Sequence, residues 1–423
     1  MRKRHLILCM VIAVLMIMPA AVFAGGRAER PAANELEIFS WWTAGGEAEG
    51  LQALIDIYNE RYPEVNVINA TVAGGAGAQA KAVLASRMQG GNPPDSFQVH
   101  AGQGIIATWV VEDFMEPVTF ILEDNGWMDD YPADVIDIIS YQGEIYSIPV
   151  NIHRSNVMWY NRSLFADNGL EPPASMAEFF QVAEQLRARG ITPLAVGGTD
   201  GWEQTHLLES VLLAELGAEA YRGLWTGATA WNGTRAKAAL ESFLRVMEYT
   251  NPDRAALTNI DAAQYVAEGR AAMTVMGDWV HGYYLSIGHT PNEEYGWVPF
   301  PGTAGNFLML SDTFGLPKDV PNPQNVERWL TLIASREGQD AFNPIKGSIP
   351  ARTDSDRSLY DAYLLSAMDD FGRDTIVPSV AHGAAASESW VTRINDVVNI
   401  LVNNRNVDQA ANEFQSLAQQ YAR

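Results

Sequence analysis

Apolar and polar positions in the first part of the chain alternate over short runs that are separated by stretches of helical spacing. The runs at 36–40, 65–69 and 96–100 predict short β-strands. Apolar residues recur every three or four positions over 51–58, and a second helical stretch covers 78–88. Strands that alternate with helices favour an α/β fold in which the strands of the sheet run parallel.

The middle of the chain has a different pattern. It is mostly helical from about 155 to 270, with long stretches at 203–216 and 234–249. Strand-like runs then return at 272–276, 295–299 and 307–310. The final stretch, 407–421, carries one apolar stripe and predicts an amphipathic helix. An α/β region that is interrupted by helices and then resumes predicts two lobes joined by several crossing segments.

The N-terminus has the three parts of a secretory signal peptide. Basic residues at 2–4 precede an apolar run at 6–18, and small residues follow it. We expect a signal peptide over 1–24 and a flexible leader over 25–34. The sequence therefore predicts a protein that is exported to the periplasm and soluble after cleavage.

Composition limits the chemistry that is available to the mature chain. The single cysteine of the full sequence, Cys9, lies in the predicted signal peptide, so we expect the mature chain to have no disulfide, thiolate nucleophile or cysteine metal site. Cys9 also lies too early to be the first mature residue, which argues against a lipid anchor. The formal net charge of −23 argues against nucleic acid and anionic membranes as partners. Hydrophobic residues make up 47% of the chain, which is enough for two lobes with separate cores.

Two adjacent tryptophans, Trp41 and Trp42, stand at the end of the first predicted strand, before a loop at 43–46. In parallel α/β sheets, ligands bind beyond the carboxyl ends of the strands. Neighbouring rings point in different directions, so one can fill the core while the other offers a flat apolar face to a ligand. These two residues alone leave both interpretations open.

Several polar residues further along the chain lie in apolar or turn-rich surroundings. They are Gln98, His100, Asp312, Lys346 and His382. Each one alone is more typical of a satisfied structural group. Together with two indole rings they suit a sugar, because hydroxyl groups form charge-assisted hydrogen bonds while a pyranose face packs on an indole.

Signatures of catalysis, metal binding and cofactor binding are weak. Neither H-E-x-x-H nor G-x-S-x-G occurs. His206 and Glu209 are spaced for one helix face, but two potential ligands do not make a zinc site, so we expect no metal. The run at 75–80 resembles a dinucleotide fingerprint, but it follows the second strand of an exported chain, and we expect no cofactor. Carboxylates are abundant, yet no spacing singles out a glycosidase pair.

Six segments carry a resemblance that extends over nearly the whole mature chain. They are FSWW at 39–42, PPDSFQVH at 93–100, PVNIHRSNVMWYN at 149–161, VMGDW at 275–279, LSDTFGLP at 310–317 and FNPIKGSI at 342–349. With these segments the chain resembles the bacterial extracellular solute-binding proteins, family 1, which feed sugar ABC importers. It is most similar to their glucose-binding branch.

The resemblance implies a two-lobed periplasmic-binding-protein fold of the maltose-binding type, with a cleft between two α/β lobes. The implied crossovers between the lobes lie near 151–155, 276–280 and 318–323. The N-terminal lobe would contain 35–151 and 279–320. The more helical C-terminal lobe would contain 152–278 and 321–423.

The resemblance also implies the residues of a site for one sugar. Trp42 would stack on the sugar, and Trp41 would line the pocket. The sugar hydroxyls would bond to Glu47, Gln98, His100, Asp312, Lys346 and His382. Further lining or supporting residues would be Asn151, Asn259, Asp278 and Trp279. Some relatives carry an aromatic residue at the place of Asn259, so one wall of the pocket would be more polar in this chain. The ligand could therefore be galactose or mannose instead of glucose.

The implied function is capture of a ligand without chemistry, so we expect no enzyme activity. A monomer would bind a monosaccharide, close around it by hinge motion and deliver it to the transmembrane subunits of an ABC permease. An exported carbohydrate-active enzyme, such as a glycosidase, is the alternative. A binding protein that docks on a chemoreceptor would share the same features.

Overall fold

A computed structural model describes residues 34–73 and 77–422 of the chain. The predicted signal peptide and residues 25–33 of the predicted leader lie outside the described residues, as does most of the glycine-rich run at 74–77. Among the helices that are described, none combines the length and the apolar character needed to cross a bilayer.

The first sheet has six strands and contains the strands predicted near the N-terminus. In spatial order they are β2 (Asn66–Thr71), β1 (Glu35–Ser40), β3 (Ser96–His100), β14 (Asp312–Pro317) and β4 (Met115–Glu116), with β7 (Ser147–Pro149) also paired to β14. β1 runs parallel to β2 and β3, as predicted. β14 runs antiparallel to β3, β4 and β7, so the sheet is mixed. β14 runs antiparallel because the chain enters this sheet again from the opposite end.

Four long helices pack around this sheet. They are α1 (Gly45–Arg61), α2 (Ala78–Gln89), α13 (Pro323–Ala334) and α14 (Arg336–Lys346). The predicted apolar positions of α1, Leu51, Leu54, Ile55 and Tyr58, are all buried. α1 begins at Gly45, which has φ of 55°, so the helix starts inside the predicted loop and carries Glu47 in its first turn.

Two further sheets follow in the rest of the chain. The four-stranded sheet has the order β10 (Thr192–Ala195), β11 (Ala271–Val275), β9 (Val157–Asn161) and β12 (Tyr295–Pro299). The three-stranded sheet has the order β15 (Thr375–Pro378), β13 (Asn306–Leu310) and β8 (His153–Arg154). A small hairpin pairs β5 (Ser140–Tyr141) with β6 (Glu144–Ile145). These positions confirm the strands predicted at 272–276, 295–299 and 307–310 to within a residue.

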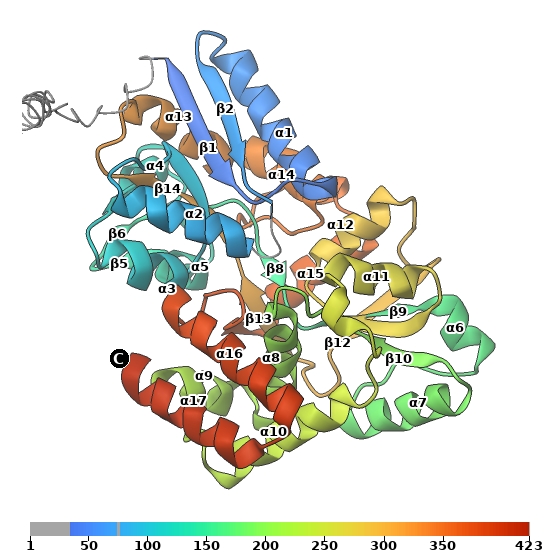
Figure 1. The fold of residues 1–423 in the computed structure, drawn as a ribbon. Helices are drawn as coiled ribbons and strands as arrows, with labels where there is room; N and C mark the ends of the chain where they lie inside the picture. The colour runs from blue at the N-terminus through green and yellow to red at the C-terminus, as the bar shows by residue number, and fades with distance from the viewer. Residues whose placement is uncertain (1–33, 74–76, 423) are drawn as a thin grey trace, which may run out of the picture. The chain divides into compact units, whose positions relative to one another are not determined.

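Helices dominate this second part of the molecule, as the sequence pattern predicts. α8 (Trp202–Leu216), α9 (Ala218–Thr226), α10 (Thr234–Met247), α16 (Glu388–Asn404) and α17 (Val407–Tyr421) pack together (Figure 1). Along α17 the predicted apolar stripe is buried except at its ends, where Val407 and Tyr421 are half-buried. The remaining helices are α3 (Gln103–Ile105), α4 (Thr119–Asp124), α5 (Ala133–Ile138), α6 (Arg162–Asp167), α7 (Met176–Ala188), α11 (Asn259–Ala267), α12 (Trp279–Ser286) and α15 (Ala362–Phe371), with single turns at Ile106–Val110, Met128–Asp130, Arg254–Ala256 and Arg357–Leu359.

The buried apolar side chains form two large clusters. One gathers residues of the six-stranded sheet and its helices, such as Leu36, Phe97 and Trp329. The other gathers residues of the four-stranded sheet and the helices around α8, such as Leu194 and Leu212. Two cores of this size are what the composition and the interrupted α/β pattern predict.

The observed pairing differs from the predicted lobe boundaries in two segments. β12 and β13, which the sequence placed in the N-terminal lobe within 279–320, pair with β9 in the four-stranded sheet and with β8 and β15 in the three-stranded sheet. α13 and α14, which the sequence placed in the C-terminal lobe, pack against α1. Both segments therefore belong to the lobe opposite to the predicted one. Side-chain packing, and not chain order, decides which core an element joins.

The chain also passes between the sheets at a place that the sequence did not predict. Residues 151–155 connect β7 of the six-stranded sheet to β8 of the three-stranded sheet, as predicted. Residues 276–280 lead from β11 into α12, which packs against α1. Residues 318–323, however, join β14 to α13, which packs back on β14. The chain instead passes between sheets at Ser311, where β13 ends and β14 begins.

Candidate functional site

A cavity of about 490 Å³ lies where the ends of several of these elements meet. This volume falls within the range of small-molecule sites. Its wall is formed by Trp41, Trp42, Thr43, Ala44, Gly45, Gly46, Glu47, His100, His153, Asp200, Trp202, Thr258, Asn259, Ile260, Trp279, Gly282, Tyr283, Ser286, Leu310, Asp312, Lys346 and His382. Aromatic side chains and convergent polar groups therefore share one wall, from segments as far apart in sequence as 41 and 382.

Seven of the eight side chains that the sequence assigned to sugar contacts line this cavity. They are Trp41, Trp42, Glu47, His100, Asp312, Lys346 and His382. The exception is Gln98. Of the four supporting residues, Asn259 and Trp279 line the cavity, while Asn151 and Asp278 are fully buried behind it.

Gln98 lies beneath the cavity and holds two of its wall residues. Its Oε1 accepts a hydrogen bond from the backbone N–H of Trp41 at 3.1 Å. Its Nε2 donates to Oδ1 of Asp312 at 2.8 Å. Each polar end of the amide is thus bonded within the protein, and Gln98 supports the wall without lining the cavity.

The two tryptophans differ in their surroundings. Trp42 packs against Phe342, with ring centroids 4.9 Å apart, and against Phe314 at 5.7 Å. Trp41 makes an edge contact with His100, with centroids 5.2 Å apart, and Nζ of Lys81 lies 5.8 Å from its ring. One indole is therefore built into the core and the other stands among polar groups, although both contribute to the cavity wall.

Asp312 is the centre of a buried polar network. Oδ2 accepts from Nδ2 of Asn151 at 2.9 Å, and Nε2 of His153 lies 3.3 Å from the same oxygen. Nδ1 of His153 contacts Asp278, which ties the network to the start of α12. Burial raises the pKa of Asp312, but the bond and the charge of His153 outweigh it and hold that pKa below its usual value. The carboxylate is therefore ionised and fixed in place before any ligand arrives.

Two other imidazoles of the cavity wall, those of His100 and His382, are held neutral. Burial lowers the pKa of His100 to about 4, and burial beside other imidazoles holds the pKa of His382 well below its usual value. His153 behaves in the opposite way. Burial would lower its pKa, but the charge of Asp278 raises it above the usual value. The site thus offers both neutral and charged hydrogen-bonding groups.

Lys346 is held where three helices meet. Its Nζ lies 2.9 Å from Oε1 of Glu47 in the first turn of α1, and the lysine is buried. A Cβ on Gly46 would lie 2.3 Å from the carbonyl oxygen of Ile345, so only glycine lets the start of α1 approach the end of α14 this closely. The pair places one positive and one negative group side by side on the wall.

A sequence comparison places the chain in a family. The profile of the bacterial extracellular solute-binding proteins matches residues 33–340. The chain belongs to this family.

Individual relatives of this solute-binding protein extend the match over most of the chain. An uncharacterised ABC transporter extracellular-binding protein of Pyrococcus horikoshii is 36% identical over 98% of this chain and 96% of its own. A probable sugar-binding periplasmic protein of Brucella suis is 30% identical over 86% of this chain and 87% of its own. A glucose-binding protein of Saccharolobus solfataricus is 26% identical over 73% of this chain and 59% of its own.

Solved structures show the same fold for this solute-binding protein. A maltose-bound protein of T. maritima has a TM-score of 0.75 at 16% identity, covering 91% of this chain and 99% of its own. A bacterial solute receptor described as preferring β-D-galactopyranose has a TM-score of 0.81 at 16% identity, covering 92% and 98%. The fold is the two-lobed α/β fold of the maltose-binding type, as the sequence resemblance implied.

Several wall residues of the solute-binding protein were not singled out from sequence. They are His153, Asp200, Trp202 and Tyr283. His153 lies inside a recognised motif, and Trp202 begins α8 after a glycine-containing turn, so each had a weak local signal. Their convergence depends on tertiary pairing, since β8 and α8 approach Asp312 only through the packing of the three sheets.

Proposed function

We propose that this solute-binding protein is the sugar-binding component of an ABC importer and that its ligand is a monosaccharide, with glucose first and galactose or mannose next. The observation that carries the proposal is the cavity wall itself. Indole faces suit the apolar face of a pyranose, and the ionised Asp312, the Lys346–Glu47 pair and the imidazoles suit its hydroxyl groups.

The relatives support sugar as the ligand class. Proteins named as sugar-binding and as glucose-binding are among them, and a structural relative is described as preferring a hexopyranose. Asn259 on the wall adds a polar group, which is the reason for keeping galactose and mannose beside glucose. We expect no cofactor in this function.

The mechanism we propose is capture by hinge closure. Trp41 and Trp42 follow a strand of the six-stranded sheet, whereas Trp202 begins helix α8 and His382 follows β15, and both of these elements contribute to the second apolar cluster. A sugar that contacts both sets gains more contacts in a closed form than in an open one, and only this difference shifts the equilibrium. A monomer in the periplasm would then present its closed form to the permease.

The affinity required is within reach of a small ligand. A micromolar dissociation constant corresponds to about −8.2 kcal/mol. Spread over roughly a dozen heavy atoms of a hexose, this is about −0.7 kcal/mol per atom, which is below the ceiling for small ligands.

Calorimetric titration tests this proposal and separates it from the glycosidase alternative. Protein that has been unfolded and refolded to remove bound ligand is titrated with glucose, galactose and mannose, and is incubated separately with maltose and longer oligosaccharides. Saturable binding of a hexose with every oligosaccharide left intact supports the proposal. Cleavage of an oligosaccharide would support the enzyme instead.

A further inference from the structure

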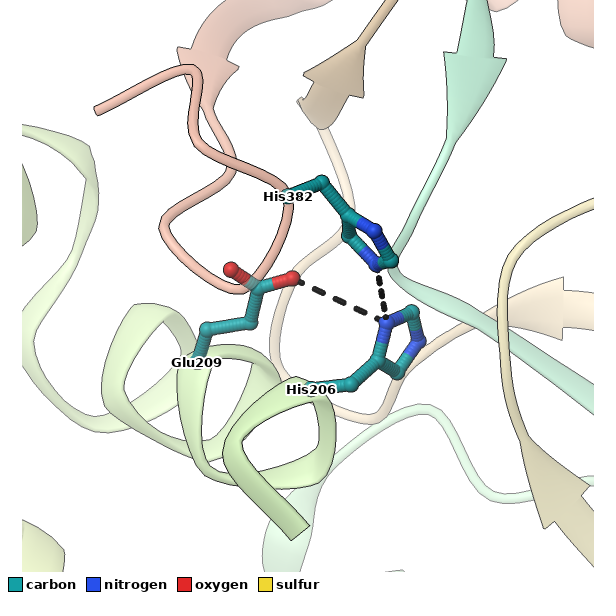
Figure 2. Close-up of side chains that lie close together, drawn as sticks. All are labelled: His206, Glu209 and His382. Atoms are coloured by element: carbon teal, nitrogen blue, oxygen red, sulfur yellow. Dashed lines mark hydrogen bonds and ion pairs between the residues drawn. The ribbon is translucent and has the colours of Figure 1, made fainter. Parts of the chain in front are cut away.

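A second cluster of chemistry-bearing side chains lies beside the cavity and shares His382 with its wall. His206 and Glu209 are on α8, and His382 is on the loop between β15 and α16. All three are buried, and Figure 2 shows both imidazoles and the carboxylate turned toward one another. From sequence, the first two were only a pair on one helix face; the fold supplies the third group.

We propose that Nδ1 of His206, Nε2 of His382 and Oε1 of Glu209 bind a divalent transition-metal ion of the zinc class.

The distances between the donor atoms suit this proposal. Nδ1 of His206 lies 3.0 Å from Nε2 of His382 and 3.9 Å from Oε1 of Glu209. All three donor atoms lie within 4.8 Å of one another. Bonds of about 2.0–2.2 Å to a tetrahedral zinc ion place two ligand atoms roughly 3.4 Å apart. Binding would therefore open the contact between the imidazoles slightly and shorten the distance from Nδ1 of His206 to Oε1 of Glu209.

The surroundings of Glu209 hold its carboxylate in a suitable position. Oε2 accepts backbone N–H bonds from Val380 at 2.8 Å and Ala381 at 3.1 Å. Oε1 accepts from the hydroxyl of Ser155 at 2.6 Å. Carboxylates that bind metals are typically held by such outer hydrogen bonds. The same contacts fix the loop that carries His382, so α8 and this loop present their donors from a stable arrangement.

A divalent cation would also compensate the charge of Glu209. The hydrogen-bond partners of this buried carboxylate include the hydroxyls of Ser155 and Ser379 and the backbone N–H groups of Val380 and Ala381, all of which are neutral.

The donor set favours one class of metal. Two imidazoles and one carboxylate suit zinc, copper or nickel, whereas magnesium and calcium prefer oxygen ligands. Three protein ligands leave the fourth position of a tetrahedral ion open. Because His382 also lines the cavity, water from the cavity can provide the fourth ligand.

Titration with zinc tests the proposal without using sugar binding as the readout. Protein treated with a chelator is titrated with zinc chloride in the presence of excess magnesium, which occupies weak acidic sites on the surface. We expect one zinc ion per chain. His206→Ala should weaken binding at least ~10-fold. His289→Ala, in a half-buried turn after α12, is the matched control and should bind as the wild type does.

Cobalt(II) gives a readout that does not depend on a variant. A four-coordinate site with imidazole ligands gives strong visible absorption, whereas hydrated cobalt absorbs weakly. Strong absorption at one equivalent supports the site. Weak absorption in the wild type, or zinc binding that His206→Ala leaves unchanged, would overturn the proposal.

Discussion

Asn151 and Asp312 exchange two hydrogen bonds at the point where the chain passes between its sheets. Nδ2 of Asn151 donates to Oδ2 of Asp312 at 2.9 Å, and the backbone N–H of Asp312 donates to Oδ1 of Asn151 at 2.8 Å. With Gln98 on the other carboxylate oxygen, the two amides fix the orientation of Asp312. The key acceptor of the proposed sugar site is therefore arranged by residues that do not line the cavity.

Asp312→Asn should weaken sugar binding more than Gln98→Asn. The first change removes a charged acceptor from the wall and is expected to cost about 2 kcal/mol, or roughly 30-fold in affinity. The second shortens an amide that only positions Asp312 and Trp41. Calorimetry on both variants gives the ranking. Equal losses would mean that the charge of Asp312 has no special role in binding.

Trp42→Ala should reduce both stability and sugar affinity, whereas Trp41→Ala should act mainly on affinity. Trp42 is 1% exposed and packs on Phe342 and Phe314, so its removal is expected to lower the free energy of unfolding by about 3–5 kcal/mol. Loss of an apolar face should cost each variant about 2 kcal/mol of binding. Chemical denaturation and calorimetry separate the two effects. Unchanged sugar affinity in Trp42→Ala would make that residue part of the core alone.

Lys346→Met should weaken sugar binding while leaving stability nearly unchanged. The methionine keeps an apolar stem of similar length, and Glu47, whose side chain is 36% exposed, is solvated by water when its partner is removed. The variant loses the ammonium group that faces the cavity beside Glu47. We expect an affinity loss of about 10-fold or more. A variant that binds sugar as tightly as the wild type would place Lys346 in a purely structural role.

Stability should fall as the pH is lowered from about 6.5 to about 4. The pKa of His100 is lowered to about 4 in the folded protein, so within this window the unfolded chain binds the additional proton. The neutral form is favoured by burial and by Lys81, against the charges of Asp312 and Glu388. The contribution of His100 to the free energy of unfolding is fully present above the pKa that this histidine has in the unfolded chain. It amounts to at most about 3 kcal/mol.

Urea unfolding at several pH values measures this effect. His100→Gln should lose less stability than the wild type between pH 6.5 and pH 4. The matched variant His289→Gln, at a half-buried position, should follow the wild type. Identical pH dependence in His100→Gln and the wild type would show that His100 does not contribute.

Local sequence patterns predicted the strands and helices well, and topology less well. β3 lies at 96–100 as predicted, because alternation and a preceding Pro93-Pro94 turn define it locally. The antiparallel position of β14 beside β3 was not predicted, since it depends on pairing between residues more than 200 positions apart. The same reason explains the misplaced boundaries around β12 and α13. Long-range pairing leaves no periodic signal in the sequence.

Most of the cavity wall was predicted through the family resemblance and not through composition. Trp41 and Asp312 lie in recognisable motifs, and both line one cavity together with His382. The role of Gln98 as a support was missed, because its alternating position on β3 predicts only that it shares a side with His100. His206 and Glu209 were seen as a pair, but the approach of His382 depends on the anchoring of its loop by Glu209.

A thermal-shift screen of ligand-free protein against glucose, galactose, mannose, xylose and maltose tests the central claim most directly. We expect one hexose to raise the melting temperature, and we expect the rise to grow with sugar concentration, as linkage requires. Trp41→Ala should reduce that shift. No shift with any of the five sugars, in protein shown to be free of ligand, would contradict the assignment of this cavity to a monosaccharide.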